Sequence, residues 1–68
     1  MHDINETVRT NIRKFRAERG LTQEKLAFKS GLHRAYIGQI ERGEKSIGLT
    51  NLQKLAVSLD VDVRDLFD

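Results

Sequence analysis

The sequence predicts an all-α fold of about five helices in a single domain. Apolar residues recur at intervals of three and four along most of the 68-residue chain, as they do in helices with one buried face. Residues that cap or end helices separate these stretches. No alternation of apolar and polar residues indicates a strand, and no repeat or low-complexity segment is visible.

The first expected helix runs from Asn5 to Glu18. Its apolar face consists of residues three or four positions apart: Ile4, Val8, Ile12 and Phe15. We expect Asn5 to be the N-cap, with Ile4 and Val8 forming a hydrophobic staple across it. Gly20 is expected to end the helix.

Two short helices, Gln23 to Lys29 and His33 to Arg42, are expected to follow. The Thr22 hydroxyl can cap the first of them, and Gly31 can end it in a left-handed conformation. The inner faces are expected to consist of small and apolar residues: Leu26, Ala27, Leu32, Ile37 and Ile40. Two helices joined by such a glycine turn are typical of a helix-turn-helix.

The rest of the chain predicts a loop and two further helices. The loop runs from Gly43 to Gly48. A fourth helix, about Leu49 to Leu59, carries apolar residues at helical spacing: Leu49, Leu52, Leu55, Ala56 and Leu59. Asp62 can cap a short fifth helix with Val63, Leu66 and Phe67.

Composition and charge narrow the class of protein. The chain has no cysteine and no apolar run near the ~20 residues of a membrane span, so we expect a soluble cytoplasmic protein. The net charge is +2, but Met1 to Lys45 carry ten basic and six acidic residues, and the remainder carries two basic and four acidic ones. The predicted helix pair therefore lies in the basic part, as a phosphate-binding surface requires.

The outward face of the His33–Arg42 helix has the side chains of a base-reading surface. With Ile37 and Ile40 turned inward, this face presents His33, Arg34, Ala35, Tyr36 and Gln39. Arginine can donate two hydrogen bonds to guanine, glutamine can pair with adenine, and an alanine methyl can contact thymine. Arg34 is the strongest candidate, because N-terminal residues of a recognition helix reach the groove floor. The alternative is an ordinary polar helix face.

The expected contacts to the DNA backbone surround this face. Gln23 opens its helix, where its side chain and free amides can meet a phosphate. The full expected set is Arg13, Arg16, Thr22, Gln23, Arg42, Lys45 and Ser46. For Arg13, Arg16 and Gln23 the alternative is simple solvation. Glu41 is expected to form an intramolecular ion pair, with Arg42 nearby in sequence.

Catalysis, a metal site and a cofactor are not expected. His2 and His33 are far apart in sequence, no cysteine is present, and the glutamates are scattered without an acid–base arrangement. The five glycines fit helix ends and close packing, and they form neither a GxGxxG nor a P-loop.

The segment TQEKLAFKSGLHRAYIGQIERG (Thr22 to Gly43) closely resembles the lambda-repressor-like (Cro/C1, XRE) family of helix-turn-helix regulators. The likeness extends over nearly the whole chain, to the closing Asp65–Phe67, and implies a five-helix DNA-binding domain spanning 1–68. LHRAYIGQIERG looks most like the controller proteins of restriction–modification systems, which are small homodimers that bind operator DNA and time endonuclease expression. The resemblance implies that Arg34, Ala35 and Tyr36 read or grip DNA and that Gln23 contacts a phosphate.

The chain departs from the controller pattern in three places. Controllers often carry a hydroxyl residue at the positions of Ala35 and Gly38, and many relatives place a proline before the fourth helix. A glycine inside a helix costs about 1 kcal/mol relative to alanine, although it allows close approach of DNA or of a neighbouring helix. The Ala35 difference affects the expected operator sequence.

The resemblance also implies dimerisation through the last two helices, residues 49–67. The candidate interface residues are apolar: Leu49, Val57, Val61, Val63 and Phe67. A two-fold dimer would place two recognition helices about 34 Å apart on a palindromic operator, with RNA polymerase as a further partner in activation. The alternative is that these residues complete the monomer core. Rival functions are a solitary phage-type repressor and an antitoxin or protein-interaction module that also binds DNA.

Overall fold

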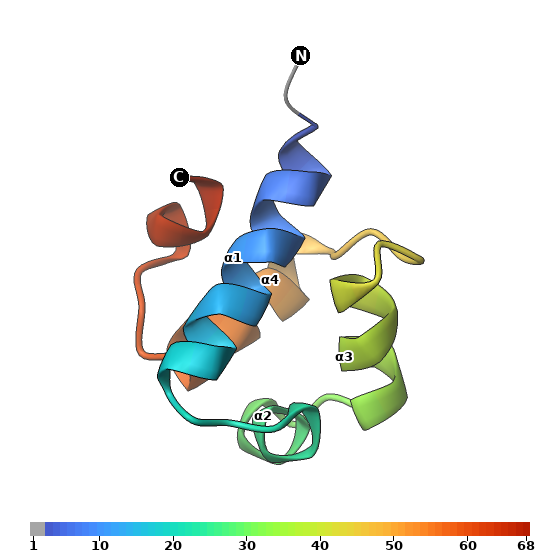
Figure 1. Cartoon of the computed structure of the whole chain (residues 1–68), viewed down its shortest axis with the longest axis vertical. Helices are drawn as coiled ribbons and strands as arrows, with labels where there is room; N and C mark the ends of the chain where they lie inside the picture. The colour runs from blue at the N-terminus through green and yellow to red at the C-terminus, as the bar shows by residue number, and fades with distance from the viewer. Residues whose placement is uncertain (1–2) are drawn as a thin grey trace.

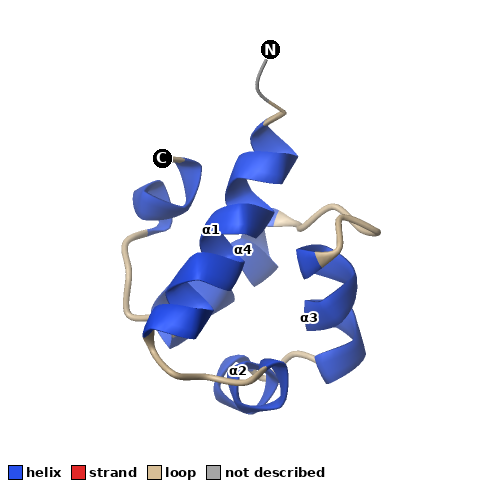
Figure 2. Ribbon diagram, viewed as in Figure 1, coloured by secondary structure: helices blue, strands red, loops and turns tan. Residues whose placement is uncertain are grey.

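Four α-helices and one 3-10 helix make up the fold in the computed structural model, which describes residues 3–68 (Figures 1 and 2). In chain order they are α1 (Ile4–Glu18), α2 (Gln23–Ser30), α3 (Arg34–Glu41), α4 (Leu49–Ser58) and the 3-10 helix η1 (Val63–Phe67). The described residues contain no strand. The all-α prediction is confirmed. The fifth expected helix is a five-residue 3-10 helix.

The helix ends named below agree with the predicted caps, with one exception. Thr22 Oγ1 accepts from the Lys25 amide at 3.0 Å, and Gly31 ends α2 at φ 73°. Asp62 caps η1 as predicted, within a capping box shared with Asp65. The Asn5 prediction is wrong: Asp3 is the N-cap of α1, its Oδ1 accepting from the Asn5 amide at 3.0 Å. A carboxylate there also interacts favourably with the positive end of the helix dipole.

The core is centred on α1 and α4, which pack against the α2–α3 pair and, on another side, against η1 (Figure 1). It is built from the apolar faces of all five elements: Val8, Ile12, Leu26, Ala27, Ile37, Ile40, Leu52, Leu55, Ala56, Leu59 and Leu66. Side chains of Asn11 and Arg19 fasten the C-terminal segment. Asn11 Nδ2 donates to the Leu66 carbonyl at 3.0 Å, and Arg19 donates to the Leu59 carbonyl at 2.9 Å and to the Asp60 carbonyl at 3.4 Å.

The packing fixes the orientation of α3. Ala27 of α2 is small and 7% exposed, and α2 packs against both α3 and α4. Ile37 and Ile40, 0% and 2% exposed, anchor the inner side of α3, and its opposite side therefore faces solvent. No helix in residues 3–68 combines the length and apolarity needed to cross a membrane. His2 lies outside the described residues.

Candidate nucleic-acid interface

The N-terminal turn of α3 presents three exposed residues side by side. His33 is the N-cap and makes no capping hydrogen bond through its side chain, and Arg34 and Ala35 follow it in the first turn. Tyr36 and Gln39 are half-buried farther round the helix. The five predicted base-reading residues are therefore on one helix, and three of them are fully open to a ligand.

Arg34 is linked to the neighbouring helix. Its Nη1 donates to Glu24 Oε2 at 3.3 Å, and both side chains are largely exposed, at 67% and 77%. An exposed pair of this kind contributes little to stability because water and salt screen it. The contact places the Arg34 guanidinium beside the first turn of α2.

Tyr36 is held by a residue of α4. Its hydroxyl oxygen accepts from Asn51 Nδ2 at 3.1 Å, while its ring packs against the core. The hydroxyl hydrogen remains available for donation to an outside acceptor, since a phenol can donate and accept at once. The packing fixes where that donor lies.

A buried ion pair lies behind the α2–α3 surface. Glu41, 3% exposed, accepts from Arg16 Nε at 2.7 Å and from Arg16 Nη2 at 2.9 Å. Arg16 Nη1 also donates to the Leu21 carbonyl at 2.9 Å, and these interactions with Glu41 raise the pKa of Arg16. Gln23 Nε2 completes the group by donating to Glu41 Oε1 at 3.1 Å.

This ion pair changes the interpretation of two predicted roles. The expected ion pair of Glu41 exists, but its partner is Arg16 of α1, 25 residues away in sequence, and not the adjacent Arg42. The three guanidinium nitrogens of Arg16 all donate within the chain, so the side chain ties α1 to α3. Gln23 is oriented by Glu41 at the N-terminus of α2, and its second amide hydrogen remains available to a ligand.

The other predicted backbone contacts lie around α3. The Thr22 hydroxyl is used as the α2 cap, and Arg13 is exposed on α1. Arg42 Nε donates to Glu44 Oε2 at 2.6 Å, and this hydrogen bond holds the pKa of Glu44 below its ordinary value. Lys45 and Ser46 are exposed in the loop after α3.

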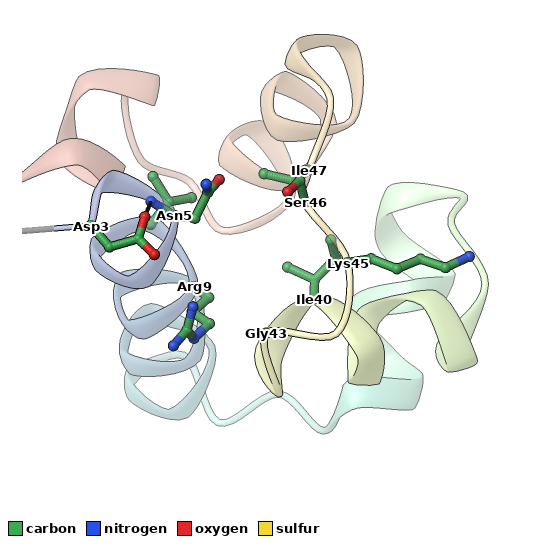
Figure 3. Close-up of a pocket in the computed structure, with 9 residues that line it drawn as sticks. Asp3, Asn5, Arg9, Ile40, Gly43, Lys45, Ser46 and Ile47 are labelled. Carbon is green, nitrogen blue, oxygen red and sulfur yellow. Dashed lines mark hydrogen bonds between the residues drawn. The ribbon is translucent and has the colours of Figure 1, made fainter.

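That loop and α1 enclose a polar cavity of about 180 Å³ (Figure 3). Arg9 of α1 lies against Gly43, where an added Cβ atom would come within 3.0 Å of the Arg9 guanidinium. Gly43 also has φ 77°, a conformation that favours glycine. Lys45 extends away from Arg9 (Figure 3), so the loop directs its lysine outward.

The predicted dimer residues occupy a separate surface on α4 and η1. Leu49 and Val57 are 81% and 74% exposed, and Val63 and Phe67 are 37% and 43% exposed. These four line a mainly apolar groove of about 420 Å³. Val61 also lines it but is half-buried against the core.

Comparisons with known proteins agree with this geometry. A family model described as Helix-turn-helix (HTH_3) matches residues 12–66, which include the whole α2–α3 unit. The chain belongs to this helix-turn-helix family.

Known relatives of this helix-turn-helix chain include restriction–modification control proteins. Control protein C.SmaI of Serratia marcescens is 45% identical over 64 residues, covering 94% of this chain and 76% of that protein. The crystal structure of the restriction–modification controller protein C.AhdI from Aeromonas hydrophila matches with a TM-score of 0.89 at 44% identity, over 93% of this chain and 96% of that one. SinR in complex with DNA matches with a TM-score of 0.85 at 32% identity, over 90% of this chain and 98% of that one.

Three residues in or beside the helix-turn-helix unit were not identified from the sequence. Asn51 of α4 gave no signal in the sequence, because its contact with Tyr36 joins segments 15 residues apart. Glu24, which contacts Arg34, was also missed. Phe28 is 89% exposed on α2, and no predicted role accounts for it. The contact of Glu24 with Arg34 could have been suspected, since both residues lie in the first turns of adjacent helices.

Proposed function

We propose that this chain is a sequence-specific DNA-binding transcription regulator that acts as a homodimer on a palindromic operator. The observation that carries the proposal is the exposed first turn of α3, with Arg34 at its outer edge and Ile37 and Ile40 fixed in the core. A rigid helix with an arginine near its N-terminus has the shape and the donors needed to read guanine in the major groove.

The proposed backbone contacts flank this helix on both sides. Gln23 lies at the N-terminus of α2, where the helix dipole favours a phosphate. Arg42, Lys45 and Ser46 follow the C-terminal end of α3, and Arg13 is exposed on α1. Tyr36 supplies a fixed hydroxyl between these groups and the base-reading turn.

Dimerisation is supported by the exposed apolar residues of α4 and η1. Side chains such as Leu49 and Val57 leave a surface that water solvates poorly, and a second copy would cover it. Two-fold symmetry would then repeat α3 about 34 Å away, one turn along the DNA. The palindromic operator follows from this symmetry.

The similarity to control proteins supports a role in a restriction–modification system. Such a regulator would exclude RNA polymerase from a promoter or contact it, and its own concentration would set operator occupancy through dimerisation. A neighbouring endonuclease gene would favour this role. A neighbouring toxin gene would favour the antitoxin alternative. The absence of both genes from the neighbourhood would favour a solitary repressor.

Selection from random-sequence DNA followed by mobility shift at two salt concentrations tests the proposal. We expect enrichment of a palindrome whose half-sites lie one helical turn apart, with affinity that falls steeply with salt. Weak, salt-sensitive binding without enrichment would contradict sequence-specific recognition and would favour a protein-interaction module.

A further inference from the structure

A carboxylate lies within the surface proposed to face DNA. Glu24 lines one concave region together with two residues of the proposed contact set, Arg34 and Gln23, and with Arg16 and Thr22. Its side chain is 77% exposed. An exposed carboxylate in this position is unfavourable for binding a polyanion, because it repels phosphate.

The contact of Glu24 with Arg34 occupies only one corner of the guanidinium. Nη1 of Arg34 donates to Glu24 Oε2 at 3.3 Å, and within residues 3–68 neither Nε nor Nη2 has a hydrogen-bond partner. Nε and Nη2 form an edge with two parallel donors. Such an edge matches both the O6 and N7 acceptors of guanine and the two oxygens of a phosphate.

The charge of Glu24 discriminates between these two ligands. A guanine edge is neutral, so a carboxylate beside Arg34 does not repel it. A phosphate carries a full negative charge, and one such repulsion across the guanidinium, at about 7 Å in water, corresponds to about a threefold loss of affinity. The same carboxylate therefore weakens phosphate binding by Arg34 and leaves base binding nearly unchanged.

We infer that Glu24 is a specificity-determining residue, which holds Arg34 for a base edge and prevents it from serving as a general phosphate contact. The inference rests on the proposed DNA-binding function. It predicts that Glu24 raises the ratio of operator binding to non-specific binding mainly by weakening the non-specific complex.

Glu24→Gln is the test variant, because glutamine keeps an acceptor for Arg34 and removes only the charge. Glu18→Gln is the matched control: it makes the same change in net charge on an exposed residue at the C-terminal end of α1, outside the proposed interface. Fluorescence anisotropy would measure the affinity of each protein for the selected palindrome and for a duplex of the same composition in shuffled order, over a series of salt concentrations.

We expect Glu24→Gln to bind the shuffled duplex about threefold more tightly than the wild type does. Its salt dependence on that duplex should steepen by about 0.9 in log–log slope, the signature of one added phosphate contact. Affinity for the palindrome should change less, so the specificity ratio falls. Glu18→Gln should show neither the steeper slope nor the lower ratio.

The Arg34→Ala background tests whether the effect passes through Arg34. There, Glu24→Gln should leave the salt slope unchanged. A slope that steepens equally without Arg34 would overturn the inference, because Glu24 would then repel phosphate directly. An unchanged ratio and slope in Glu24→Gln, with a wild-type protein that prefers the palindrome, would overturn this inference alone. A wild-type protein with no preference would overturn the proposed function as well.

Discussion

Removal of the buried carboxylate of Glu41 should severely destabilise the protein. In Glu41→Ala, Arg16 loses two hydrogen bonds of 2.7 and 2.9 Å and Gln23 loses one of 3.1 Å. Breaking one side of a buried ion pair typically costs 3–5 kcal/mol, because the other charge stays unpaired. The Arg16 side chain is 18% exposed and can reach some water, so we expect the lower end, about 3 kcal/mol.

For a domain of this size, such a loss corresponds to a decrease in Tm of about 12–24 °C. Thermal unfolding followed by circular dichroism would measure it. Glu41→Gln keeps an acceptor oxygen and should lose less. Glu44→Ala is the matched control, because it breaks the pair with the exposed Arg42 and should leave the Tm close to the wild-type value. Equal Tm values for Glu41→Ala and Glu44→Ala would refute the assigned role of the buried pair.

Three further substitutions test other parts of the structure. Gly38→Ala should raise the Tm by about 3–8 °C, because alanine favours a helix interior and the nearest obstacle, at 2.9 Å, is the terminal nitrogen of the long Arg42 side chain. A lower Tm would mean that Arg42 cannot move aside. Val57→Asp should shift the protein to monomer in sedimentation velocity without unfolding it, whereas Phe28→Asp, at a still more exposed position on α2, should not. A dimer that survives Val57→Asp would remove this surface from the interface. The pKa of Asp62 is held down by hydrogen bonds from Arg64, so its stabilising effect is complete above the ordinary value of 3.8 and is lost as pH falls through the lower folded-state pKa. Asp62→Asn should therefore have a lower Tm than the wild type at pH 7 and the same Tm in strong acid, and a constant difference would contradict this.

Local chemistry made most of the fold predictable. Thr22, Gly31 and Asp62 mark element boundaries through interactions with their own neighbours, so their roles can be read from a few residues. The apolar spacing around Ile37 and Ile40 gave the inner face of α3 and hence its outer face. These predictions needed no knowledge of how distant segments meet.

The missed features depend on contacts between distant segments. Glu41 is charged and the adjacent Arg42 offers a partner close in sequence, so nothing local indicates that Glu41 is buried and paired with Arg16 across 25 positions. Asp3 precedes Asn5, and both can cap a helix, so composition alone could not choose between them. The last helix is only five residues long, and at that length the 3-10 and α forms are not separable by apolar spacing.

The most direct test of the central claim compares Arg34→Ala with Arg13→Ala on the selected palindrome and on the shuffled duplex. If Arg34 reads a base, its loss should cost about 1–3 kcal/mol on the palindrome, roughly 5- to 150-fold in affinity, and relax selection at one position of each half-site. Loss of the proposed backbone contact at Arg13 should weaken both duplexes alike. An Arg34→Ala protein that binds the palindrome as tightly and as selectively as the wild type would contradict base recognition by α3.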